Sequence, residues 1–129
     1  PVCYAEYLAA LYILAADDAI FELAHNCVSC AGIDFIWLYE KMDSAGLMAH
    51  QYTLVQVAES LFRDHDAEPF PLFDLIALDY DDLDIVVNAL YIRKSRGRVP
   101  ARDSNGSMTL DCSYENCIRR MLDLTSSTA

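Results

Sequence analysis

Glycine, proline and basic residues are scarce in this chain, and the scarcity of glycine and of basic residues argues against particular kinds of binding site. Of 129 residues, four are glycine and four are proline, and nine basic residues stand against twenty acidic ones. So few glycines cannot build a loop that cradles phosphate through its backbone N–H groups. The net charge of −11 repels phosphate backbones and anionic membranes. We therefore expect no direct nucleic-acid binding and no membrane partner.

We also expect no secretory signal. The apolar stretch 8–16 is preceded by Glu6 rather than by a basic residue, and it is too short to cross a bilayer. The chain has five cysteines, which is an odd number. In a chain without an export signal, cysteines are expected to be reduced thiols. The sequence therefore predicts a cytoplasmic location.

Apolar residues are plentiful, at 54% of the chain. This fraction exceeds the usual 45–50% or so of soluble domains, so apolar surface is left over for a second copy or a hydrophobic partner. We expect a homodimer, with a tightly packed helical monomer as the alternative. The length fits one domain, which we place at residues 1–124, followed by a flexible tail at 125–129.

Apolar residues recur at three- and four-residue steps along most of the chain, which predicts an all-α fold. Thr53 and Gln56 have the spacing of a capping box and would open one helix, and Gly46 would end the helix before it. The expected helices span residues 3–25, 33–45, 53–66, 72–78 and 81–94, with a last one starting at Asp111 or Ser113. Together they predict a compact bundle of five to six helices.

Three details of this bundle stay open in the sequence. The helix at 3–25 has a wide apolar arc, so it faces either its own core or a second subunit. The short run 72–78 follows Pro71, which favours a helix, although a buried strand is the alternative. Residues 26–32 are expected to form a turn, and residues 95–107 a polar loop.

Cysteine supplies the clearest chemical pattern. His25, Cys27 and Cys30 have a spacing typical of structural zinc sites. The second pair, Cys112 and Cys117, fits poorly, because five residues on a helix separate two side chains by about 140°. Ordinary thiols are therefore favoured, no metal or cofactor is assigned, and metal binding by Cys27 and Cys30 stays open.

Acidic residues are densest at 79–84. The cluster lacks the glycine and glutamate that shape a calcium loop, and a helix start rich in aspartate accounts for it. It lies in a segment, 66–91, with seven acids and no base, whereas residues 92–129 carry a net charge of +3. The basic run 93–102 is a candidate for binding phosphate or an acidic surface, although such a run is more often solvated or neutralises acids on the same protein. Trp37 falls off the apolar face of its helix, which makes it a candidate contact residue, with closure of the core edge as the more ordinary alternative. The predicted partner-binding residues are Trp37, Glu68, Asp74, Asp79, Asp81, Asp82 and Asp84.

The histidines at 25, 50 and 65 do not belong to a recognisable catalytic motif. No serine or cysteine has the flanking glycines of a nucleophile elbow. The sequence favours a non-catalytic, acidic regulator that inhibits or neutralises a partner protein with a basic or hydrophobic patch. Anti-activators, antitoxins and immunity proteins work in this way. The alternatives are a DNA mimic that occupies a nucleic-acid-binding protein, a small helical enzyme, and a zinc-stabilised module.

Overall fold

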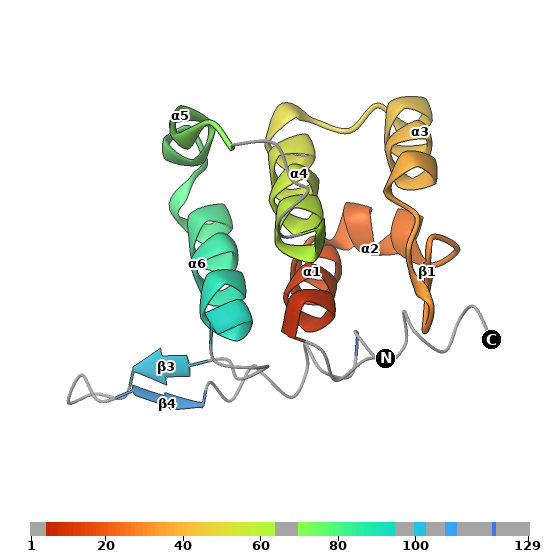
Figure 1. Ribbon diagram of the computed structural model, residues 1–129. Helices are drawn as coiled ribbons and strands as arrows, with labels where there is room; N and C mark the ends of the chain where they lie inside the picture. Colours follow the sequence, from red (N-terminus) through yellow and green to blue (C-terminus); the bar gives the residue numbers. More distant parts are fainter. Residues whose placement is uncertain (1–4, 64–69, 95–99, 103–107, 111–119, 121–129) are drawn as a thin grey trace.

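The computed structural model describes residues 5–63, 70–94, 100–102, 108–110 and 120. Within these residues the chain forms an all-α bundle, as predicted, together with two minimal antiparallel hairpins (Figure 1). The helices are α1 (Ala5–Ala16), α2 (Asp18–Ala24), α3 (Phe35–Ala45), α4 (Ala49–Arg63), α5 (Leu72–Ile76) and α6 (Tyr80–Lys94). The strands are β1 (Val28–Ser29), β2 (Gly32–Ile33), β3 (Pro100–Arg102) and β4 (Met108–Leu110).

Helix α1 is the centre of the bundle. It packs against α2, α4 and α6, and eight of its twelve residues are buried. Its apolar surface is therefore covered by its own chain. The wide apolar arc left open whether this helix faces its own core or a second subunit, and in the structure it faces the core. Asn88 of α6 donates to the Tyr12 hydroxyl at 2.9 Å, so one polar contact ties the central helix to its neighbour.

The first predicted helix, 3–25, is two helices in the structure. Asp17 takes an extended backbone conformation and its carboxylate accepts a hydrogen bond from the Ile20 N–H at 2.9 Å. An aspartate in this position caps a new helix, so α1 ends at Ala16 and α2 begins at Asp18. The break lets the chain turn while both halves keep their apolar faces in the core.

The loop between α3 and α4 confirms one predicted signal and corrects another. Gly46 ends α3 in the left-handed conformation, with φ of 69°, as expected for a C-terminal glycine. Thr53, however, does not open α4. The helix begins four residues earlier, at Ala49, and the Thr53 hydroxyl donates back to the Ala49 carbonyl.

The remaining segments agree with most of their predictions. Residues 72–76 are helical, as Pro71 suggested, and α6 begins one residue before the expected start. The predicted turn at 26–32 contains the β1–β2 pairing, and the predicted loop at 95–107 contains β3, which pairs with β4. The last expected helix lies outside the described residues except for Arg120, which is helical. The domain boundary at 124 and the tail stay predictions.

The helices form a slab with two edges (Figure 1). Helices α1 and α4 occupy the middle, α6 lies along one edge with α5 beyond its first residues, and α3 forms the opposite edge next to α2. The two edges do not pack on each other, so side chains that point outward from α3 and from α6 belong to separate surfaces.

Candidate protein-binding surfaces

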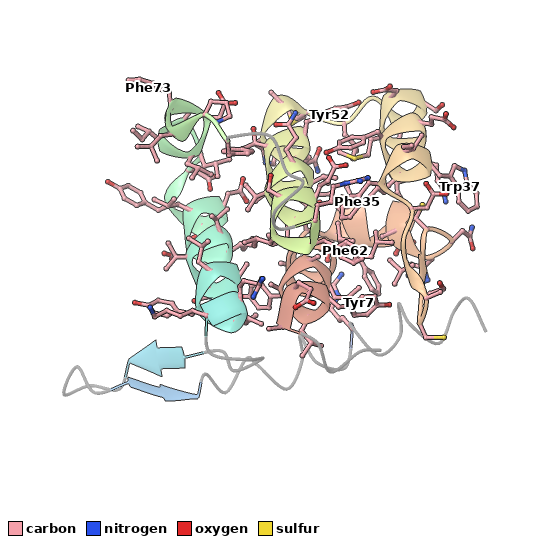
Figure 2. All side chains as sticks on the ribbon, in the orientation of Figure 1. Tyr7, Phe35, Trp37, Tyr52, Phe62 and Phe73 are labelled. Carbon is pink, nitrogen blue, oxygen red and sulfur yellow. The ribbon has the colours of Figure 1, made fainter. Side chains whose placement is uncertain are left out.

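The outward face of α3 carries Trp37. Asp34 caps the helix by accepting from the Trp37 N–H at 3.0 Å. Phe35, Leu38 and Met42 then turn inward and are buried. Ile36 and Trp37 lie on the other side, 70% and 42% exposed. Figure 2 shows Trp37 projecting from this edge. The sequence placed Trp37 off the apolar face, and its exposure agrees with that placement.

Two open hollows adjoin the Trp37 ring. One, of about 480 Å³, lies between Trp37, Leu23 and the second half of α3. The other, of about 370 Å³, lies between Trp37 and the β1–β2 hairpin. The Lys41 ammonium stands 4.9 Å from the ring centre, a cation–π contact that holds the indole on its helix. The indole therefore forms a ridge between two depressions that side chains of another protein can fill.

The opposite edge, formed by α5 and α6, exposes a larger set of apolar side chains. Phe73 is 83% exposed and points away from the bundle in Figure 2, and Tyr80 is 86% exposed. Helix α5 has no buried residue at all. The large exposed side chains of this edge are Leu72, Phe73, Ile76, Tyr80, Val87, Leu90 and Tyr91. These residues make the α5–α6 edge the more apolar of the two exposed edges.

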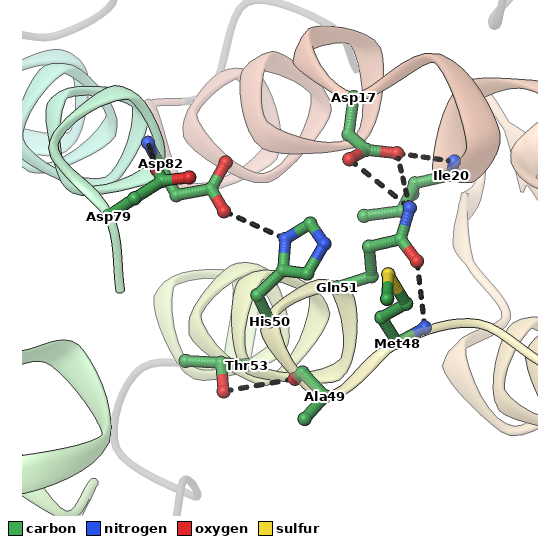
Figure 3. A network of polar contacts seen from close by, with 9 residues as sticks. All are labelled: Asp17, Ile20, Met48, Ala49, His50, Gln51, Thr53, Asp79 and Asp82. Atoms are coloured by element: carbon green, nitrogen blue, oxygen red, sulfur yellow. Dashed lines mark hydrogen bonds and ion pairs between the residues drawn. The ribbon is translucent and has the colours of Figure 1, made fainter. Parts of the chain in front are cut away.

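The aspartates at 79–84 divide into two structural roles. Asp79 caps α6 by accepting from the Asp82 N–H at 2.8 Å. Asp82 is only 8% exposed, and its carboxylate lies 2.8 Å from Nδ1 of His50 on α4 (Figure 3). Asp81 and Asp84 are exposed, as is Asp74 on α5. The cluster is thus partly structural, and Asp82 is turned inward, toward α4.

A second polar network joins the starts of α2 and α4 (Figure 3). The Gln51 amide oxygen accepts from the Met48 N–H at 2.9 Å, and its nitrogen donates to the Asp17 carboxylate at 3.2 Å. Within the described residues, no buried side-chain nitrogen or oxygen lacks a hydrogen-bond partner. These polar contacts join the helices of the bundle to one another.

The pattern of His25, Cys27 and Cys30 does not gather into one cluster. Cys27 is buried, with its sulfur 3.6 Å from the Leu23 carbonyl oxygen, and burial raises its thiol pKa. Cys30 is exposed, and the His25 ring packs edge-on against Phe21. No group of three metal-binding side chains occurs in the part of the chain that the structure describes. Cys112 and Cys117 lie outside it.

The predicted partner-binding residues therefore do not form one patch. Trp37 lies on the α3 edge, whereas Asp74, Asp79, Asp81 and Asp84 lie on the α5–α6 edge, and Glu68 is outside the described residues. The exposed apolar residues of α5 and α6 were missed as candidates. Their signal is present in the sequence, because α6 carries apolar residues on both faces, which a helix with one buried face does not require.

Comparison with known proteins adds no relative: no family model, no curated protein and no solved structure matches the chain. None of the helices in the described residues is long and apolar enough to cross a membrane. The bundle and its two exposed edges are thus what defines the class of this protein, a small helical bundle with apolar side chains presented outward.

Proposed function

We propose that this protein is a non-catalytic regulator that binds and restrains a partner protein through the α3 edge. Trp37 anchors the partner, and the two hollows beside it receive the partner's apolar side chains. Once bound, the bundle occludes the partner's working surface, as anti-activators, antitoxins and immunity proteins do. The cytoplasmic location expected from the sequence belongs to the same proposal.

The exposure of Trp37 is the observation that carries this proposal. Tryptophan is the residue most enriched among the few that dominate binding energy, and such residues insert into matching depressions of the partner. In a chain with a single tryptophan, burial in the core is the ordinary use of that side chain. Here three other α3 residues fill the core, and Trp37 stays outside with Ile36 beside it.

Charge supports the same role and describes the partner. Asp34, which caps α3, and Glu40 on α3 are exposed, and each lines one of the two hollows beside the indole. The net charge of −11 adds a long-range attraction for basic surfaces, which raises association rates. The partner we expect presents apolar side chains within a basic surface. The aspartates on the other edge contribute to this field without touching the partner.

Capture from the source organism's lysate, followed by reconstitution, tests the proposal. Tagged wild type, Trp37→Ala and Phe73→Ala are compared, because Phe73 is an aromatic on the opposite edge that is more exposed than Trp37. A captured protein is identified by mass spectrometry, purified and titrated calorimetrically. We expect one-to-one binding that Trp37→Ala weakens about 30-fold, equivalent to roughly 2 kcal/mol, and that Phe73→Ala leaves unchanged.

Salt separates this role from charge mimicry. Binding anchored by Trp37 persists at about 0.5 M salt, because apolar burial is not screened. A DNA mimic would instead capture a nucleic-acid-binding protein and lose it at that salt, since its contacts are ionic. Equal weakening by both substitutions, or none by Trp37→Ala, would contradict the assignment of the α3 edge.

A further inference from the structure

Helix α6 has a second apolar face that its own bundle does not cover. Val86, Ala89 and Ile92 are buried against the bundle. On the outer side, Tyr80, Asp84, Val87, Tyr91 and Lys94 follow one another at alternating steps of four and three residues. This spacing forms the seam along which two helices pack side by side. Leu90 flanks the seam and is 48% exposed, and Val87 at its midpoint is 38% exposed.

The two ends of this seam carry opposite charge. Asp81 and Asp84 are exposed near the start of α6, and Lys94 is exposed at its end. The rest of the chain extends this division, because residues 66–91 hold seven acids and no base, and residues 93–102 hold five bases and no acid. An antiparallel helix of the same kind would place its basic end against this acidic start, and its acidic start against this basic end.

We propose that the occupant of this face is a second copy of the chain, with the two α6 helices antiparallel and a two-fold axis passing at Val87. The fifteen residues of α6 extend about 22 Å, and Val87 is the eighth of them. The axis at Val87 places Tyr80 level with Lys94 of the second copy. It also places Asp81 level with the second copy's Arg93.

Charge and shape favour this arrangement over its rivals. A parallel pair would set Asp81 and Asp84 against the same two carboxylates of the other copy, which is repulsive. A two-fold axis brings the same patch of both copies together, so the patch must complement itself. The α6 seam meets this condition, because its acidic start faces the basic end of the other copy. The apolar residues supply affinity, while the opposite charges of the two helix ends fix the direction, because exposed charges contribute little to affinity individually.

This dimer is independent of the role of Trp37, since it uses the opposite edge. It also places the aspartates at 81 and 84 near the basic end of α6 in a second copy of the same chain. The two α3 edges of the dimer would remain outside the contact, so a protein bound at Trp37 would find two equivalent sites.

Mass in solution gives the first test. Sedimentation velocity and light scattering on purified protein over a concentration series should report twice the monomer mass. Val87→Asp puts two carboxylates at the axis and should raise the dissociation constant about tenfold or more. Ile36→Asp, on the outward face of α3, serves as the matched control and should leave the dimer intact. Circular dichroism verifies that both variants remain folded.

Cross-linking tests the register and the direction. Val87→Cys should form a disulfide-linked dimer under mild oxidation, because the two sulfurs meet at the axis. Tyr80→Cys and Lys94→Cys should each stay unlinked, whereas the double variant should link. All of these are measured in a Cys30→Ser background, since the native Cys30 is exposed, with that background alone as the control.

Each outcome bears on the proposal. A dimer that Val87→Asp dissociates and that links at position 87 supports it. Linking by Tyr80→Cys alone would indicate a parallel pair and overturn the arrangement. A dimer insensitive to Val87→Asp would lie on another face, and a monomer at all concentrations would remove the second copy altogether. Capture of another protein that requires Val87 but not Trp37 would assign the α6 face to a different partner.

Discussion

The side-chain amide of Gln51 joins the carboxylate of Asp17 to the start of another helix. Its nitrogen donates to Asp17, which caps α2, and its oxygen accepts from the Met48 N–H at the start of α4. Gln51 is nearly buried, at 9% exposure. One neutral side chain thus satisfies the Met48 N–H and the carboxylate of Asp17, which lies 34 residues from Gln51 in the sequence. The amide therefore connects the start of α2 to the start of α4.

Replacing this amide by a carboxylate should destabilise the bundle. Gln51→Glu can still accept from Met48, but it cannot donate to Asp17 and sets two negative charges together. We expect a loss of about 1–3 kcal/mol in the free energy of unfolding at pH 7. The loss should shrink at acidic pH, where the carboxyl introduced at position 51 becomes protonated and can donate. Urea unfolding at several pH values measures it.

Two controls isolate the contact between Gln51 and Asp17. Gln56→Glu, which is exposed on the same helix, adds the same charge without the contact and should change stability by less than about 0.5 kcal/mol. Asp17→Asn in the Gln51→Glu protein should restore most of the loss, because an amide again faces a carboxylate. Equal effects of the changes at 51 and 56 would show that the contact does not matter.

The helices could be predicted from the sequence, but the break at Asp17 could not. The apolar spacing continues from Leu11 through Ile20 without interruption, so periodicity alone favours one helix. Asp17 and Asp18 are of a residue type that commonly caps helices. Aspartate also occurs on the solvent-exposed side of a continuous helix, so the sequence alone does not distinguish the two cases. The choice depends on Gln51, which satisfies the second carboxylate oxygen from a distant part of the chain.

The start of α4 shows a related limit. Thr53 and Gln56 match a capping box in spacing, and the structure places Thr53 inside the helix. Gln51 makes the contact that the glutamine of such a box would make, but with Met48 rather than a threonine ahead of it. The methionine side chain has no oxygen that could accept a hydrogen bond from the helix, so only the contact made by Gln51 is formed. This single contact has no recognisable sequence pattern.

The binding surfaces could be predicted in part. The position of Trp37 off the apolar face indicated an outward side chain. The roles within the aspartate cluster could not be separated, because Asp82 turns inward only where His50, 32 residues away, meets it. The apolar outer face of α6 was hidden for a different reason: with apolar residues on both sides, the helical pattern alone does not distinguish the buried side from the exposed one.

The contact between His50 and Asp82 should couple α4 to α6. His50→Ala leaves a carboxylate that is 8% exposed without its partner across the helices, so we expect a loss of about 1–2 kcal/mol. Asp82→Ala should cost a similar amount. The double variant should lose clearly less than the two single losses together, since both remove the same contact. Urea unfolding of the four proteins gives this coupling energy.

Asp84→Ala provides the matched control, because Asp84 is an exposed carboxylate on the same helix. Combined with His50→Ala it should show additive losses. Additive losses for His50 and Asp82 instead would mean that the contact contributes nothing measurable to the stability of the bundle.

Gly46 should resist replacement by any residue with a side chain. Its φ of 69° lies in the left-handed region, and a Cβ added there would meet no atom within 4 Å. The cost of Gly46→Ala is therefore one of backbone conformation alone, about 1 kcal/mol. Gly46→Asn should cost less, because asparagine tolerates this conformation better. Thermal unfolding of the three proteins should follow the order Gly, Asn, Ala, and an alanine variant as stable as the wild type would refute the argument.

Tyr7 should make the protein sensitive to alkali. Its hydroxyl donates to the Ser29 carbonyl, and burial, with a smaller effect of Cys30, raises its pKa from 10.0 to about 12. The folded state therefore holds this proton more tightly than the unfolded state does. The resulting stability is fully present below pH 10 and is lost as the pH rises toward 12.

Tyr7→Phe separates the two contributions. At pH 7 it should be less stable than the wild type by about 1 kcal/mol, because the Ser29 carbonyl loses its donor. Phenylalanine does not titrate, so the difference should shrink above pH 10 and can change sign by pH 11. Tyr39 and Tyr52, whose pKa values are also raised, titrate in both proteins and cancel in the comparison. Denaturant unfolding at pH 7, 9, 10 and 11 measures the difference, and a difference that stays constant across this range would contradict the raised pKa of Tyr7.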